Sequence, residues 1–171
     1  MPDSLDLARW ITHPAWAAHA TAERHAADTG TPEPLAPAGL PTLFHSLSVP
    51  TDAVAVTIDV RATLAHRVTV DGLPVPGPSM GTLDLTHHVR GGALHVVIEL
   101  ERHAPSTGAP AVRACVSVLH ADGSREHHPT DQAWGARLTT PWGTSASAAV
   151  LPSPAGDTPA RNGHRQAVLT R

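Results

Sequence analysis

Histidine is the residue type in this chain best suited to chemistry, with 13 in 171 residues. One set combines imidazoles with a carboxylate and a guanidinium: His45, His66, His95, Glu99, Arg102 and His103. Imidazole titrates near neutral pH, so such a set in an apolar pocket could perform general acid–base catalysis. On the solvated face of an antiparallel sheet, the same side chains would have no special role. His45 and His66 argue most for a site, because they interrupt apolar faces of their segments.

The candidates divide according to two hypotheses about the site. The catalytic candidates are His66, His45, Glu99 and Arg102. The ligand-binding candidates are Trp16, His66, His95, Arg102 and His103. Sugars commonly stack on exposed aromatic rings, and this chain has four tryptophans, one phenylalanine and no tyrosine. Trp16 is therefore either such a platform or an anchor for the N-terminal segment.

The sequence predicts no metal site. The adjacent histidines at 87–88 and 127–128 would point to opposite faces of a strand, so neither pair chelates one ion easily. Cys115 is the single cysteine, which excludes an internal disulfide and a cysteine-based zinc site. No nucleophile elbow, phosphate-binding loop or dinucleotide fingerprint is present, so we expect no cofactor.

The charge pattern bears on partners and location. The chain has 12 scattered arginines, no lysine and a formal net charge of -3, which argues against a nucleic-acid partner. No apolar run is long enough to cross a bilayer, and the N-terminus lacks the pattern of a secretory signal. We therefore expect a soluble cytoplasmic protein.

Strands dominate the predicted secondary structure. Val54, Val56, Ile58 and Val60 alternate strictly, and residues 93–101 and 112–119 show the same period of two. Asp-Gly at 122–123 predicts a hairpin that returns over 125–128. A helix is expected near 15–27 and a proline-rich loop at 29–41. The pattern predicts an all-β antiparallel sandwich or jelly roll over 42–171, with residues 1–41 as an N-terminal extension packed on it.

The order of several short motifs resembles one family. The motifs are ARWI at 8–11, HRVTVDG at 66–72, GTLDLT at 81–86, VRGGAL at 89–94, ADGS at 121–124, TD at 130–131 with Trp134, and PWG at 141–143. Together they resemble the N-terminal β-sandwich of bacterial α-L-rhamnosidases, a galactose-binding-like domain. The resemblance implies that Trp10, Trp134 and Trp142 are buried. Such domains often carry a structural calcium, for which Asp71, Asp84 and Asp131 lie near suitable turns.

The resemblance does not imply rhamnosidase activity. In that family the catalytic carboxylates belong to a helical barrel that follows the sandwich, and this sequence ends at Arg171. The family usually has an aromatic residue where His66 stands, and asparagine where Asp71 stands. The first hypothesis is a free-standing module that binds a carbohydrate or a similar small polar ligand. The alternative is a small cofactor-free biosynthetic enzyme, a cyclase or isomerase, with His66 in a pocket on the concave face. A third is a homo-oligomer, or a subunit or fragment of a larger hydrolase.

Overall fold

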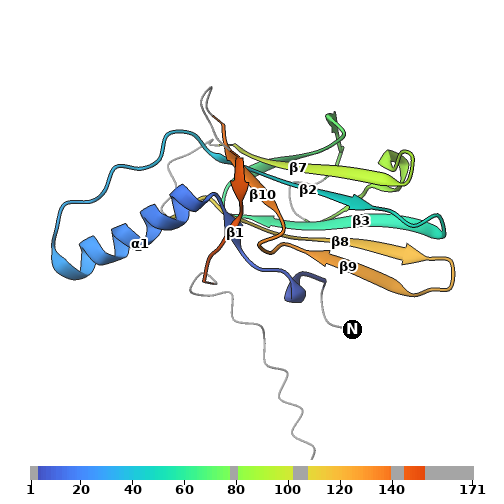
Figure 1. The fold of residues 1–171 in the computed structure, drawn as a ribbon, viewed down its shortest axis with the longest axis horizontal. Helices are drawn as coiled ribbons and strands as arrows, with labels where there is room; N and C mark the ends of the chain where they lie inside the picture. Colours follow the sequence, from blue (N-terminus) through green and yellow to red (C-terminus); the bar gives the residue numbers. More distant parts are fainter. Residues whose placement is uncertain (1–3, 78–80, 102–107, 140–144, 153–171) are drawn as a thin grey trace, which may run out of the picture.

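The computed structural model describes residues 4–77, 81–101, 108–139 and 145–152, which form two facing antiparallel sheets with one helix projecting from an end (Figure 1). Sheet A contains β1 (Ile11–Thr12), β3 (Ala53–Ala62), β6 (Gly81–Asp84), β8 (Val112–His120), β9 (Arg125–Pro129) and β12 (Ala149–Val150). Sheet B contains β2 (Pro41–Ser48), β4 (Ala65–Val70), β5 (Leu73–Pro74), β7 (Ala93–Glu101), β10 (Gly135–Leu138) and β11 (Ser145–Ser147). The predicted all-β sandwich is confirmed.

The strand order places long strands in the middle of each layer. In sheet A it is β12-β1-β8-β3-β6, and β9 also pairs with β8. In sheet B it is β11-β10-β2-β7-β4-β5. Two short 3-10 helices, η1 (Ser4–Leu7) and η2 (Thr86–His88), lie outside the sheets. β6 is the edge strand of sheet A, and β4 lies next to the short edge strand β5 of sheet B; the chain crosses between these layers after β5.

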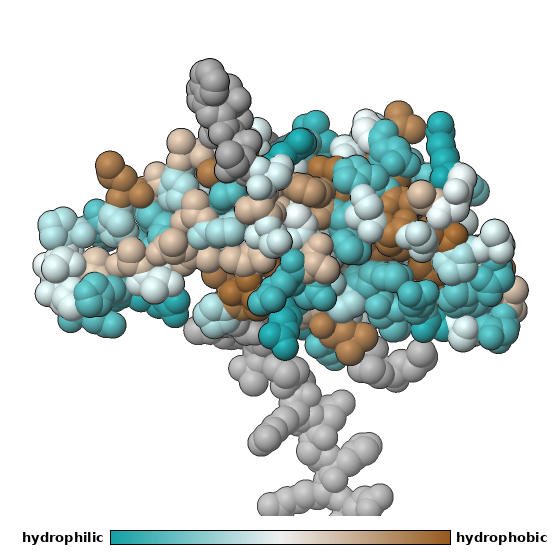
Figure 2. Space-filling view, in the orientation of Figure 1, coloured by the Kyte–Doolittle hydropathy of each residue, from teal (hydrophilic) through white to brown (hydrophobic). Residues whose placement is uncertain are grey.

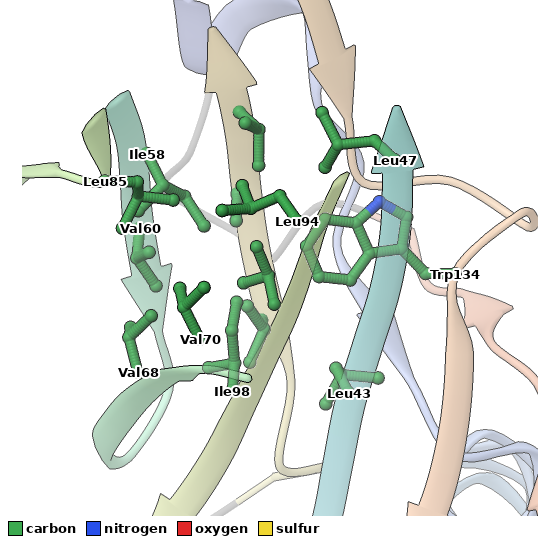
Figure 3. Close-up of a cluster of buried hydrophobic side chains, with 14 of the residues drawn as sticks. Leu43, Leu47, Ile58, Val60, Val68, Val70, Leu85, Leu94, Ile98 and Trp134 are labelled. Atoms are coloured by element: carbon green, nitrogen blue, oxygen red, sulfur yellow. The ribbon is translucent and has the colours of Figure 1, made fainter. Parts of the chain in front are cut away.

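The core is built from the apolar residues that alternate along the strands (Figure 3). Leu94, Val96 and Ile98 of β7 are at most 1% exposed. Trp134 is also 1% exposed, and its indole N–H donates to the Pro129 carbonyl oxygen at 3.2 Å. Burial of such side chains is the main force that holds two sheets face to face.

One member of the alternating series departs from the prediction. Val54 was expected inside with its neighbours, but its side chain is 54% exposed, whereas Val56 is 1% exposed. The pairing of β3 with β8 shifts between Ala53 and Ala55, so Val54 is the extra residue of a β-bulge. A bulge changes the face to which a side chain points, which explains the exception.

The predicted hairpin and the Asp-Gly turns are confirmed. β8 and β9 pair from Cys115 opposite Pro129 to Leu119 opposite Arg125. Gly123 takes φ 85°, a value that favours glycine. At the β4–β5 turn, Asp71 and Gly72 both have positive φ, 49° and 77°, as a type I′ turn requires.

The N-terminal region contains the predicted helix. Helix α1 (Pro14–Thr29) begins with proline after His13, whose Nδ1 accepts a bond from the Ala15 N–H at 3.1 Å. Gly30, with φ 68°, ends the helix in the left-handed conformation. Before the helix, β1 pairs with β8 and β12, so part of the N-terminal region belongs to sheet A itself.

Some expectations fall on other parts of the chain. The part of the predicted sandwich from residue 153 onward and the expected burial of Trp142 lie outside the described residues. Trp10 and Trp134 are buried, as the resemblance implied. None of the described helices is long and apolar enough to cross a membrane.

Candidate functional site

Strand register divides the predicted site residues between the two faces of sheet B. His45 lies opposite Val96, and His66 lies opposite Leu100, so both belong to the face that carries the core. His95 and Glu99 alternate with those buried residues of β7 and therefore point outward. Of the catalytic candidates, the described three, His66, His45 and Glu99, therefore do not share one face.

The two core-side histidines are also far from each other. They flank β7 on opposite sides and are offset by four residues along it. With about 3.3 Å per residue and about 4.8 Å per strand, their backbones lie roughly 16 Å apart. They cannot hold one small ligand between them, so each imidazole must be considered in its own surroundings.

His66 lines a pocket at the edge of the sandwich. The pocket has a volume of about 230 Å³. Its walls come from β4, from the connection after β5 and from β6, through His66, Arg67, Val68, Val75, Pro76, Gly77 and Leu83. It therefore opens where the edge strands of the two layers come together. Of these lining residues, only His66 was among the site residues predicted from the sequence.

The local sequence explains why the connection forms a wall. After the turn at Asp71–Gly72, the Val75 N–H donates to the Val68 carbonyl oxygen at 3.0 Å, which ties the connection back to β4. Gly77 lies so close to Leu83 that a β-carbon at Gly77 would overlap the leucine side chain. A larger residue at position 77 would force the Leu83 side chain or the connection to shift.

The electrostatic environment favours a neutral His66. Burial lowers the pKa of the His66 imidazole below its ordinary value, although a hydrogen bond with the Leu64 backbone and the nearby Glu101 carboxylate oppose this. A neutral imidazole presents one N–H donor and one acceptor nitrogen. Its one N–H is engaged by the Leu64 backbone, so at neutral pH His66 can accept a hydrogen bond or a proton from a polar ligand through its other nitrogen.

A charged pair lies beside the same pocket. Arg67 Nη2 is 2.7 Å from Glu101 Oε1, with side chains 58% and 31% exposed. Arg67 also lines the pocket and lies opposite Glu99 in the strand pairing. An exposed ion pair adds little stability. Arg67 alternates with His66 along β4, so the pair lies toward the outer face of sheet B, and Glu101 is not among the residues that line the pocket.

His45 occupies a different environment. Its ring stacks on Trp134, with centroids 5.1 Å apart and an angle of 14° between planes. Burial lowers the pKa of His45, and His128 nearby lowers it further, whereas Asp131 and a bond with the Ala133 backbone oppose the shift. These contacts describe a packed structural histidine, and no described residue of the His66 pocket takes part in them.

The outward-facing candidates form a polar patch. His95 Nδ1 and Ser46 Oγ are 2.7 Å apart, and the His95 ring is tilted against Phe44 at 6.2 Å. Glu99 lies opposite Thr42 on one side and Arg67 on the other. The patch is a solvated sheet face with one partly exposed aromatic ring.

Trp16 is an anchor and not a platform. Its side chain is 4% exposed, and its indole N–H donates to the Gly39 carbonyl oxygen at 3.0 Å. The ring also makes an edge contact with His19 at 5.4 Å. The expectation that Trp16 could stack a sugar is corrected, because both ring faces are enclosed. Arg102 and His103 lie outside the described residues.

The carboxylates considered for calcium serve local turns. Asp84 Oδ1 accepts from the Thr86 N–H, and Asp131 Oδ1 accepts from the Ala133 N–H, each at 2.8 Å. Hydrogen bonds from the Thr86 side chain and from its backbone N–H lower the pKa of Asp84. Within the described residues, no group of three or more His, Cys, Asp or Glu side chains is placed to hold a metal ion.

Comparison with known proteins identifies the fold. No protein-family model and no curated protein matches the sequence. Among solved structures, Streptomyces avermitilis α-L-rhamnosidase in complex with L-rhamnose is similar, with TM-score 0.58 and 18% identity over 78% of this chain and 12% of that chain. The α-L-rhamnosidase of Aspergillus terreus gives TM-score 0.58 and 16% identity over 81% of this chain and 17% of its own.

A lectin shares the same architecture. The Pleurotus ostreatus lectin in complex with GalNAc gives TM-score 0.61 and 20% identity, over 86% of this chain and 42% of the lectin chain. The chain thus spans between about an eighth and two fifths of the length of these neighbours. The likeness confirms the rhamnosidase-type β-sandwich that the order of motifs indicated.

Proposed function

We propose that this protein is a carbohydrate-binding module and that it binds one sugar unit, or a similar small polar ligand, in the His66 pocket. The observation that carries the proposal is the neutral imidazole of His66 in the wall of a pocket of about 230 Å³, with Arg67 also among the lining residues. Sugar hydroxyls both donate and accept hydrogen bonds. A neutral His66 offers an acceptor nitrogen, and Arg67 offers donors.

The apolar part of the pocket suits a sugar as well. Val68, Val75 and Leu83 line the wall beside His66. Such side chains can contact the C–H groups on one face of a pyranose, while the polar groups reach its hydroxyls. The fold gives independent support, because two solved neighbours carry L-rhamnose and GalNAc in their structures.

The experiment is a calorimetric titration of the full chain with L-rhamnose, GalNAc, galactose and glucose. Saturable binding of at least one sugar is expected, and His66→Ala should weaken it at least tenfold. His25→Ala is the matched control, because His25 is an exposed histidine on α1 and does not line the His66 pocket. Silence across the panel, or equal loss in both variants, would remove the proposal.

The enzyme hypothesis has one specific observation in its favour. Burial keeps His66 neutral, so this imidazole could take a proton from a bound substrate near neutral pH. Its proposed partners His45 and Glu99 lie elsewhere, so His66 would act as the single base with Arg67 beside it.

Solvent exchange separates the two functions. A sugar that binds is incubated with the protein in D₂O, and its carbon-bound positions are followed by NMR. Deuterium incorporation that disappears in His66→Ala would support an isomerase or cyclase. Binding without incorporation supports the carbohydrate-binding module.

A further inference from the structure

A second pocket lies between helix α1 and the sandwich. Its volume is about 230 Å³, and its walls are formed by Trp10, Ala20, Arg24, Thr63, Gly108, Ala109, Ala111, Leu151 and Pro152. None of these residues lines the His66 pocket. In Figure 2, apolar surface is visible just below the part of the helix that meets the sheets.

The arrangement of α1 leaves this space open. The buried side chains of Trp16 and His19 contact the loop that leads from α1 to β2. The Trp16 indole N–H donates to the Gly39 carbonyl oxygen, and His19 Nε2 lies close to the Pro34 carbonyl oxygen. Ala20 and Arg24 are one turn apart and share the face that lines the pocket. Because Ala20 has only a methyl side chain, the helix does not fill the space opposite Trp10.

The walls offer a ligand few hydrogen bonds. Among the lining residues, Arg24 has the only charged side chain and Thr63 the only hydroxyl. The Thr63 Oγ1 already accepts a hydrogen bond from the Ala111 N–H at 2.9 Å. Thr63 N–H in turn donates to the Ala111 carbonyl oxygen at 3.0 Å. A polar ligand would lose its hydrogen bonds to water here and find few partners in the walls. A ligand with an apolar ring or chain is therefore favoured.

Arg24 supplies a charge that the described residues do not neutralise. Its Nε donates to the Ala20 carbonyl oxygen at 3.3 Å, and no described carboxylate forms an ion pair with it. The neighbouring Glu23 is instead 3.5 Å from His19 Nδ1. A guanidinium at the mouth of an apolar pocket is suited to a carboxylate, which it can bind in bidentate fashion.

We infer that this pocket binds a small amphipathic carboxylate, with its ring or branched chain against Trp10 and its carboxylate on Arg24. An apolar cavity of about 150 Å³ is enough for benzene, so the larger space here accommodates a ring with a short side chain. 3-Phenylpropionate has this form. The inference concerns a second ligand class and does not depend on sugar binding at His66.

The test is an NMR titration of the ¹⁵N-labelled full chain with 3-phenylpropionate and with its neutral amide. The carboxylate should bind saturably and shift the Trp10 indole signal, while the Trp134 signal stays in place. The amide should bind about fivefold more weakly. Equal affinity for the two compounds, or no saturable shift up to 10 mM ligand, overturns the inference.

Two variants complete the test. Arg24→Gln should weaken the carboxylate about fivefold and leave the amide unchanged, whereas Arg125→Gln, the same change at an exposed position on β9, should alter neither. Ala20→Leu keeps a strong helix former and fills the pocket, so both compounds should lose binding. Full binding to Ala20→Leu with an unchanged melting curve would place the ligand elsewhere and contradict the inference.

Discussion

The imidazole of His45 lies nearly parallel to the indole of Trp134, with ring centroids 5.1 Å apart. Trp134 is 1% exposed, so the contact fixes one histidine of sheet B against the core. His66, on the same face, borders a pocket instead. The sequence pattern placed these two histidines in one candidate set. In the structure, His45 packs on an aromatic ring, whereas His66 borders a pocket. This difference makes their roles separable by experiment.

Acid should destabilise the protein through both histidines. Burial lowers the pKa of His45 and of His66 in the folded state, whereas in the unfolded chain each titrates near 6.5. Below that pH the unfolded state binds more protons, so the free energy of unfolding falls as pH drops and levels off below the folded pKa values. Urea unfolding between pH 7.5 and 5.5 measures this slope.

The variant His45→Phe isolates one contribution to that slope. Phenylalanine keeps a ring on Trp134 and removes the titrating group, so the acid-dependent loss should be smaller than in the wild type. At pH 7.5 the stability should change by less than about 1 kcal/mol. His25→Phe, at an exposed helix position, should keep the wild-type slope. An unchanged slope in His45→Phe would contradict the environment assigned to His45.

The bulge in β3 predicts unequal effects for two valines that lie two positions apart. Val56→Ala removes buried methyl groups from the core and should cost about 2 kcal/mol of unfolding free energy. Val54→Ala should stay within about 0.5 kcal/mol, because that side chain is largely in water. Chemical denaturation of both variants checks the register. Equal costs would mean that β3 continues its alternation without the bulge.

Alternation along the strands predicted most of the fold. It placed Val56, Ile58 and Val60 inside, and the Asp-Gly pair at 122–123 located the hairpin. Val54 could not be assigned correctly, because a bulge depends on how two strands pair and not on one strand's pattern. The N-terminal helix was expected over 15–27 and runs from Pro14 to Thr29.

The candidate site was predicted less well, for two physical reasons. The period of two already sets His95 and Glu99 apart from the buried face of β7, while His66 shares a face with Val68 and Val70. The alternation alone therefore places His66 on a different face of the sheet from His95 and Glu99. Val75 and Leu83 could not be found in this way, because they reach the pocket from a connection that crosses between layers.

The anchoring role of Trp16 predicts a local effect. Trp16→Ala removes a buried ring and its bond to Gly39, so α1 should lose protection from amide hydrogen exchange while β7 and β8 keep theirs. Hydrogen exchange followed by NMR measures the two regions separately. Leu35→Ala is the control, because Leu35 is 97% exposed and its loss should change neither region. A uniform loss in all elements would contradict the local anchor.

The close approach of Gly77 to Leu83 is testable by adding one methyl group. Gly77→Ala should cost about 1–3 kcal/mol, since the new β-carbon overlaps the leucine side chain, and should weaken any ligand of the His66 pocket. In the background Leu83→Ala the added methyl has room, and most of its cost should disappear. Chemical denaturation of the wild type, the two single variants and the double variant completes this double-mutant cycle. Additive costs would show that the two residues do not touch.

Sugar binding at His66 should depend on pH with a definite sign. The folded imidazole has a lowered pKa, so it stays neutral from pH 8 down to about its ordinary value near 6.5. Over that range the affinity should be constant, because the imidazole stays neutral and keeps its acceptor nitrogen. Below it, protonation removes the acceptor and adds a charge, so the affinity should fall. Titrations at pH 8, 7, 6 and 5 follow this. His66→Gln keeps one donor and one acceptor without titrating, so its weaker affinity should show no such decline. Affinity that rises in acid would mean that the ligand prefers the imidazolium, and it would favour an anion over a neutral sugar.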